Sequence, residues 1–114
     1  MTNQDGLAWK IATGEAHLTV TDNRVWIALQ CRAESWNYVA ETQKHIAGLI
    51  GMAQSHFNAS IRKLIEMDMI IRTPDTGKGA KLMLNPFMFW KGDAKDQKGA
   101  QSMYRRLAER GRKA

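Results

Sequence analysis

Apolar residues recur at helical spacing in two neighbouring stretches of the chain. From Gln54 to Met67 they occupy positions i, i+4, i+7 and i+8, which predicts an amphipathic helix with one buried face. From Thr42 to Gly51 a shorter helix is expected, because Thr42 is a favourable N-cap and Gly51 a favourable stop. The residues expected to be buried are Ile46, Ala47, Leu49 and Ile50 in the shorter helix, and Phe57, Ile61, Leu64 and Ile65 in the longer one.

The segments on either side of this pair predict one more helix and three short strands. A first helix is expected after Thr21 and Asp22, both favourable N-cap residues. Residues 35–40 are aromatic and β-branched, which favours a short strand. Residues 69–73 and 80–84 are also expected to be strands, joined by a turn rich in Pro and Gly. The apolar face of the first helix consists of Val25, Trp26, Leu29 and Ala33.

This order of elements predicts an α+β fold, a winged helix-turn-helix that is mostly helical with a small antiparallel β-wing. Within the helix pair, Ala47 provides a small residue at the expected crossing point. Gly51 tolerates the positive φ that the turn needs. The alternative interpretation of the pair is an ordinary helical hairpin within a bundle.

The chain is expected to form one domain with an arm before it and a tail after it, because 114 residues suffice for one core. Residues 1–19 are predicted to be an N-terminal arm and residues 20–92 the winged helix-turn-helix DNA-binding domain. Residues 93–114 are predicted to be a basic C-terminal tail, partly helical or disordered. Asn85-Pro86 is expected to end the last strand and begin a short helix, and the polar residues 92–99 are expected to form a linker.

The charge of the chain favours a polyanionic partner. Seventeen Lys and Arg against eleven Asp and Glu give a net charge of +6, and the pI is near 9.8. A membrane is not expected as a partner, because no apolar run approaches the roughly 20 residues that span a bilayer and no signal peptide opens the chain. The single cysteine, Cys31, fits a reducing, cytoplasmic location, and we expect it to be a small buried residue inside a helix.

If the helix from Gln54 to Met67 enters a major groove, its polar side chains are the candidate base contacts. Gln54 and Asn58 can each form two hydrogen bonds with the edge of adenine, and Ala59 can contact a thymine methyl group. Cationic side chains in the preceding helix, the wing and the tail are candidate phosphate contacts. The candidate DNA-binding residues are Thr42, Gln43, Lys44, Gln54, Ser55, His56, Asn58, Ala59, Arg62, Lys63, Arg72, Lys78, Lys81, Arg105 and Arg106.

The sequence offers no motif for catalysis or for a cofactor. The string TGKG lacks the spacing of a phosphate-binding loop. His17, His45 and His56 have no Cys partners and no metalloprotease spacing, so no metal site is expected. The chain is therefore predicted not to be an enzyme, with no cofactor and no small-molecule substrate. The four Trp residues are expected in the core or at a subunit interface.

The middle of the chain resembles the RepL-type plasmid replication proteins and, more distantly, MarR-like winged-helix regulators. The resemblance covers residues 20–92 and rests on the strings ETQKHIAGLIGMAQSHFNASIRKLIEMDMIIRT and MLNPFMFWKGD. It implies a protein that binds plasmid or phage DNA at repeated or palindromic sites, with Gln54, Ser55, His56 and Asn58 as base-reading positions. The chain departs from the family at Ala53, where a capping Ser or Thr is usual, and at Asp68, where Gly is usual.

We therefore expect sequence-specific binding of double-stranded DNA by a homodimer on repeated sites. The process would be the replication, transfer or transcription of plasmid or phage DNA. Two alternatives remain open at this point, because charge alone does not separate DNA from RNA. They are an RNA-binding module and a protein-interaction winged-helix module.

Overall fold

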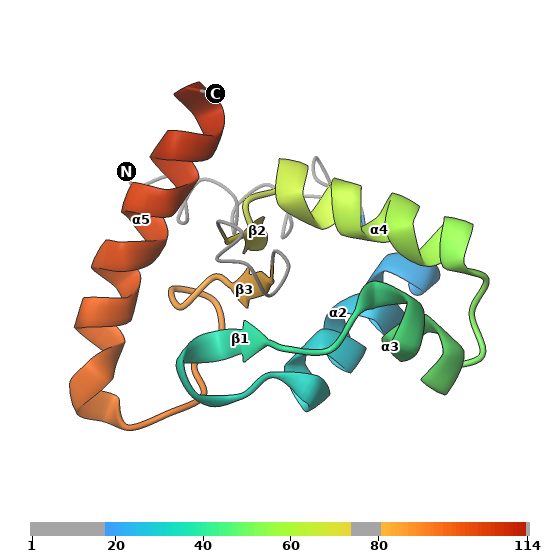
Figure 1. The fold of residues 1–114 in the computed structure, drawn as a ribbon, viewed down its shortest axis with the longest axis horizontal. Helices are drawn as coiled ribbons and strands as arrows, with labels where there is room; N and C mark the ends of the chain where they lie inside the picture. Colours follow the sequence, from blue (N-terminus) through green and yellow to red (C-terminus); the bar gives the residue numbers. More distant parts are fainter. Residues whose placement is uncertain (1–17, 74–80, 114) are drawn as a thin grey trace.

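The computed structural model describes residues 18–73 and 81–113. Within these residues the chain forms four α-helices and a three-stranded antiparallel sheet, so the predicted α+β class is confirmed (Figure 1). The predictions for residues 1–17 and for the turn 74–80, Lys78 included, lie outside the described residues. In the part of the chain that is described, no helix is long and apolar enough to cross a membrane.

Helix α2 (Val20–Arg32) begins three residues earlier than the start expected after Thr21 and Asp22. Its N-cap is Thr19, whose hydroxyl accepts a hydrogen bond from the backbone N–H of Asp22 at 3.1 Å. The carboxylate of Asp22 in turn accepts the N–H of Thr19 at 3.0 Å. The two bonds form a capping box, so the prediction that Thr21 or Asp22 caps the helix was wrong: Asp22 is the third helical residue and reaches back.

The predicted strand at 35–40 is a strand only in its second half, β1 (Tyr38–Val39). The first half is a 3₁₀ turn, η1 (Ser35–Asn37), in which Trp36 and Asn37 adopt left-handed backbone angles with φ of 66° and 64°. The conformation is held by Asn37, whose buried side chain donates to the carbonyls of Leu84 and Phe89 at 3.0 and 2.6 Å. Asparagine tolerates the left-handed region better than most residues, which fits its place here.

Helices α3 (Gln43–Leu49) and α4 (Gln54–Glu66) form the predicted pair. Thr42 caps α3 as expected, since its hydroxyl accepts the N–H of His45 at 3.1 Å. The turn after α3 is a Schellman motif: Gly51 has φ of 65°, and the N–H groups of Gly51 and Met52 bond carbonyls of the last turn at 3.2 and 2.9 Å. One burial prediction in α3 was wrong, because the Leu49 residue is 56% exposed.

Helix α4 ends in a second Schellman motif with an aspartate in the position that glycine usually takes. Asp68 has φ of 57°, and its carbonyl accepts hydrogen bonds from Asn85 Nδ2 at 2.7 Å and from the Tyr104 hydroxyl at 3.2 Å. The hydroxyl of Tyr104 also lies 3.0 Å from Asp68 Oδ1. These contacts hold a non-glycine residue in the left-handed region, so the departure from the family pattern at this position has a local structural basis.

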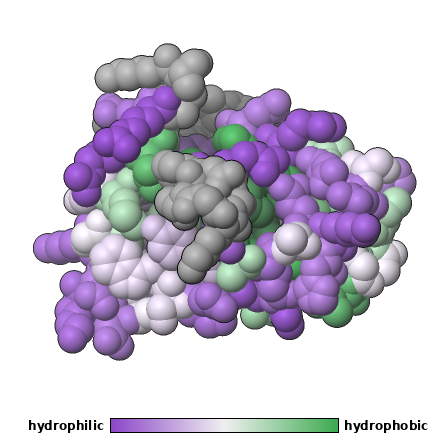
Figure 2. Space-filling model, in the orientation of Figure 1, coloured by the Kyte–Doolittle hydropathy of each residue, from purple (hydrophilic) through white to green (hydrophobic). Residues whose placement is uncertain are grey.

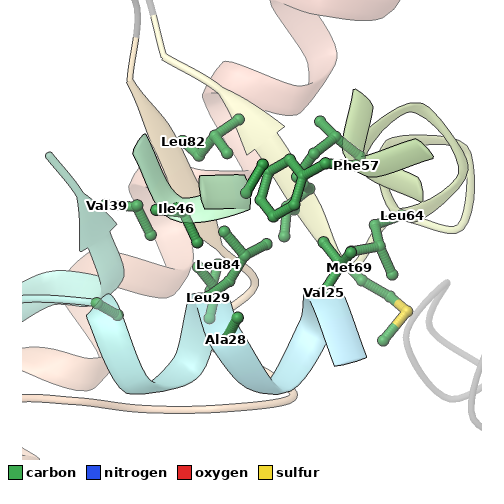
Figure 3. Close-up of a cluster of buried hydrophobic side chains, with 14 residues drawn as sticks. Val25, Ala28, Leu29, Val39, Ile46, Phe57, Leu64, Met69, Leu82 and Leu84 are labelled. Carbon is green, nitrogen blue, oxygen red and sulfur yellow. The ribbon is translucent and has the colours of Figure 1, made fainter. Parts of the chain in front are cut away.

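Strands β2 (Ile70–Arg72) and β3 (Leu82–Leu84) complete the sheet in the order β1–β3–β2, with Ile71 opposite Met83. Alternate side chains point to opposite faces. Ile70, Leu82 and Leu84 face α2, α3 and α4 in the main core, part of which Figure 3 shows. Ile71 and Met83 face the other side.

Helix α5 (Gln97–Lys113) covers that second face (Figure 1). Ala100, Tyr104 and Ala108, spaced by four residues, are buried against Ile71 and Met83. The prediction of a linker at 92–99 was therefore wrong from Ala94 onward, because the short helix η2 (Ala94–Asp96) leads directly into α5.

The short helix predicted at Asn85-Pro86 is absent from the described chain, which forms a turn there. The side-chain oxygen of Asn85 accepts the N–H of Phe87 at 2.9 Å, and the backbone carbonyl of Asn85 accepts the N–H groups of Met88 and Phe89. These bonds close a compact turn rather than start a helix.

Candidate nucleic-acid interface

An open polar cleft of about 420 Å³ lies between the first turn of α3, one side of α4 and the edge of the sheet. Figure 2 shows mainly hydrophilic side chains over the side of the molecule on which α3 and α4 lie. The cleft brings together residues that are far apart in the sequence. It is lined by Glu41, Thr42, Gln43, Lys44, Gln54, Asn58, Arg62, Arg72, Lys81 and Leu82.

Each element contributes to the cleft for a simple geometric reason. Gln54, Asn58 and Arg62 are spaced by four residues and so form one stripe along α4, beside the buried stripe. Arg72 is two residues after Ile70 and so shares with it the face of the sheet that is turned toward α3. Lys81 is tied to the residue that follows β2, since its backbone N–H and carbonyl both bond Thr73.

A chain of hydrogen bonds crosses the cleft. Arg72 donates from a guanidinium nitrogen to Gln43 Oε1 at 2.8 Å. Gln43 donates from Nε2 to Asn58 Oδ1 at 2.9 Å. The chain connects β2, α3 and α4, so these elements hold one another's polar side chains in place.

The electrostatic character of the cleft is cationic. Of the described residues that line it, four are Lys or Arg and one, Glu41, is acidic. The carboxylate of Glu41 is engaged by Arg32 and by His45, whose Nε2 lies 3.0 Å from Glu41 Oε2. The hydrogen bond from Arg32 holds the pKa of Glu41 below its ordinary value, so this carboxylate stays charged and paired at neutral pH.

The structure places four predicted contacts of α4 outside the cleft. Ser55, His56 and Ala59 are exposed on the helix but do not line it. Lys63 lies on the side of α4 that faces α2, where its Nζ is 2.7 Å from Asp22 Oδ2. We therefore withdraw Lys63 as a predicted phosphate contact, because an ion pair within the fold already occupies its charge.

Asp22 is the centre of a polar network between α2 and α4. The residue is only 5% exposed, and it accepts hydrogen bonds from Thr19, from the Ser60 hydroxyl at 2.8 Å and from Lys63. Burial by itself raises the pKa of Asp22, but these bonds outweigh burial and hold the pKa well below its ordinary value. Sequence reasoning missed this role, because Asp22 was interpreted only as a cap.

The two predicted contacts in the tail also lie away from the cleft. Arg105 and Arg106 are exposed on α5, which covers the opposite face of the sheet from α3 and α4. The guanidinium of Arg105 sits 4.4 Å from the centre of the Phe87 ring, a cation–π contact within the fold.

Two further residues of the cleft, Glu41 and Leu82, were not predicted. Glu41 immediately precedes the cap of α3, and that position is the one signal in the sequence that could have placed it there. Leu82 is buried, and its place follows only from the pairing of β3 with Arg72 on β2.

Cys31 lies in a helix as predicted, but the prediction that it is buried was wrong, because it is exposed on α2. It lines a second, mainly apolar cleft of about 410 Å³ between α2 and α3, together with the exposed Ile27 and Leu49. Among the described residues, no group of three or more His, Cys, Asp or Glu is placed to hold a metal ion.

The Trp prediction is confirmed for the three Trp residues that the structure describes, and Trp9 lies outside the described residues. Trp26 packs against the main core. Trp36 and Trp90 pack edge to face at 6.2 Å against the second core.

No protein family, curated protein or solved structure matches this chain in the three comparisons made with known proteins. The resemblance to RepL-type and MarR-like proteins is not tested by that outcome and stays a prediction.

Proposed function

We propose that the chain is a winged helix-turn-helix protein that binds duplex DNA through the cleft between α3, α4 and the sheet. The observation that carries the proposal is the composition of this cleft. Four cationic side chains surround the carboxamides of Gln43, Gln54 and Asn58. Cationic side chains are groups that contact phosphates, and carboxamides are groups that read base edges.

The order of elements supports the proposal. A helix, a short strand, a helix pair and two antiparallel strands follow one another, and the sheet order is β1–β3–β2. The helix pair with its tight turn and the hairpin directly after it are the parts from which a winged helix-turn-helix is built. In this proposal α4 is the recognition helix and enters the major groove, which is wide enough to admit an α-helix.

The cations of the cleft would supply the part of the affinity that does not depend on sequence. Lys44 lies on α3, Arg62 on α4 and Arg72 on β2, and Lys81 directly precedes β3, so the four cations can reach phosphates on both sides of a groove. If each neutralises one phosphate, the logarithm of the binding constant falls with the logarithm of the salt concentration with a slope of about 3.6, or roughly 0.9 per phosphate.

From the resemblance alone, we further propose that the protein acts in the replication, transfer or transcription of plasmid or phage DNA, as a dimer on repeated sites. Occupation of two successive major grooves would place the half-sites about 34 Å apart. The spacing of any repeat in the preferred site is therefore a direct report on the arrangement of two copies.

The first test is selection from a random duplex pool at about 150 mM salt, where purely non-specific binding is weak. We expect an enriched sequence, and a repeat within it if two copies bind. No enrichment from duplex DNA, with preferential recovery of single-stranded RNA from a parallel pool, would overturn the proposal in favour of RNA binding.

The second test compares charge removal inside and outside the cleft. Arg62→Ala and Lys44→Ala should each reduce the salt slope by about 0.9. Lys98→Ala is the matched control, since Lys98 is an exposed cation on α5 and its removal changes the net charge equally. Equal losses in all three variants would show that binding follows total charge and not the cleft.

A further inference from the structure

The hydrogen-bonded chain across the cleft has a direction. A guanidinium group has donors and no acceptor, so Arg72 can only donate. Gln43 must therefore present its Oε1 to Arg72, at 2.8 Å, and its Nε2 to Asn58. Asn58 must accept that bond with Oδ1, at 2.9 Å.

The direction of the chain decides what Asn58 presents to a ligand. Its Oδ1 is engaged by Gln43, and its Nδ2 donates to no other residue of the described ranges. Asn58 is half-buried at the centre of the stripe that also contains Gln54 and Arg62. A half-buried amide donor in an open cleft is best satisfied by an acceptor on the ligand.

We propose that Asn58 reads an acceptor edge, namely the O6 and N7 of guanine, and that Gln43 and Arg72 are the positioning residues that impose this choice. The inference rests on the proposed function. It replaces the sequence-based expectation that Asn58 bonds adenine with both ends of its amide. That contact needs Oδ1 to accept a second hydrogen bond, from the adenine amino group, beside the bond from Gln43. The guanine contact uses only the two hydrogens of Nδ2.

The same reasoning predicts that replacing the amide nitrogen of Gln43 by oxygen reverses the preference of Asn58 for guanine over adenine. In Gln43→Glu the side chain keeps its shape and its bond with Arg72, but it has only acceptors to offer to Asn58. The amide of Asn58 then turns over, so that Nδ2 faces the carboxylate and Oδ1 faces the base. An outward acceptor matches the amino group of adenine, and preference at that position should move from guanine toward adenine.

The experiment measures base preference, because the added negative charge of Gln43→Glu weakens binding to every duplex. Selection and sequencing with wild type and Asn58→Ala first identifies the base position that depends on Asn58. We expect guanine there in the wild type, favoured over adenine on the order of tenfold. Gln43→Glu should reverse this ratio at that position and leave the other positions unchanged.

Gln43→Ala is the matched variant that removes the chain without reversing it. Asn58 can then turn freely, so guanine and adenine should be bound to within about twofold of each other. Thermal melting of each variant separates a change in reading from a change in folding, and Gln43→Ala keeps the test decisive if Gln43→Glu is unstable.

The outcomes distinguish this inference from the proposed function. An enriched site in which the position that depends on Asn58 is adenine, or an unchanged preference in both Gln43 variants, would overturn the inference and leave DNA binding intact. An absence of duplex binding by the folded wild type would overturn the proposed function and this inference with it.

Discussion

Replacing Lys63 by methionine should separate folding stability from DNA binding on α4. In the wild type its Nζ lies 2.7 Å from the carboxylate of Asp22, a residue that is 5% exposed. Methionine keeps most of the aliphatic stem and the helix propensity but removes the charge. Asp22 is then left buried with only its bonds from Thr19 and Ser60.

The magnitude follows from the burial of the two partners. Removing one partner of a fully buried ion pair costs roughly 3–5 kcal/mol, and an exposed pair contributes about 0–1 kcal/mol. The Lys63 side chain is 36% exposed, and Asp22 keeps its other partners. We therefore expect a loss of about 1–2 kcal/mol in the free energy of unfolding, or a Tm roughly 4–10 °C lower.

The dependence on pH gives a second, independent measurement of the same interaction. The folded pKa of Asp22 is held well below its value in the unfolded chain. The stability that this carboxylate contributes is therefore present above about pH 4 and is lost as the pH falls through the folded pKa. Without Lys63 the folded pKa of Asp22 rises, so the difference in Tm between wild type and Lys63→Met should narrow below about pH 4.

The assay combines thermal melts between pH 7 and 2.5 with DNA affinities measured far below both melting temperatures. Arg62→Ala is the matched control, since Arg62 is the preceding residue and lines the cleft. Lys63→Met should lower the Tm and leave the Kd unchanged. Arg62→Ala should leave the Tm unchanged and raise the Kd. A wild-type Tm for Lys63→Met, or a loss of affinity equal to that of Arg62→Ala, would refute the reasoning.

Three further substitutions probe the fold around the cleft. Asn37→Asp turns a carboxylate oxygen toward the two carbonyls that the amide now reaches at 3.0 and 2.6 Å, and urea titration should show a loss of about 3 kcal/mol at pH 7 that shrinks as the carboxyl becomes protonated. Tyr104→Phe removes the hydroxyl that bonds Asp68, so we expect the free energy of unfolding from urea titration to fall by about 1 kcal/mol and the Kd for DNA to stay unchanged. An unchanged midpoint of urea unfolding would contradict that contact. Arg105→Ala should cost about 0.5 kcal/mol through its cation–π contact, its neighbour Arg106→Ala should cost nothing, and neither should alter the salt slope of DNA binding.

The helix pair could be predicted from the sequence because its signals are local. Thr42 and Gly51 bound α3, and the apolar stripe of α4 has the spacing of one helix face. Helix α5 was harder to predict, because its buried residues include two alanines and its mean composition is polar. Only the presence of Ile71 and Met83 on the second face of the sheet gives Tyr104 a place to pack, and that depends on strand register.

In the candidate site, too, some features follow from local sequence and others depend on long-range pairing. Residue type and helical spacing were enough to select Gln54, Asn58 and Arg62. They were not enough to separate Arg62 from Lys63, because the partner of Lys63 is 41 positions earlier in the chain. Long-range pairing decides which of two adjacent cations is available to a ligand, and no window of sequence contains that information.

Contacts on both flanks of α4 fix the rotation of this helix about its axis. On one flank the helix is tied to α2 through the bonds of Ser60 and Lys63 with Asp22, and on the other flank Asn58 is tied to α3 through Gln43. A helix held on both flanks and packed along its buried face cannot turn about its axis without breaking contacts on at least one side. The rotation of the polar stripe is therefore set before any ligand arrives, so the backbone of α4 has little conformational entropy to lose on binding. It follows that a substitution at Asp22, which is remote from the cleft, should weaken base preference only if it allows α4 to rotate. A substitution at Gln43 should change base preference while α4 keeps its position.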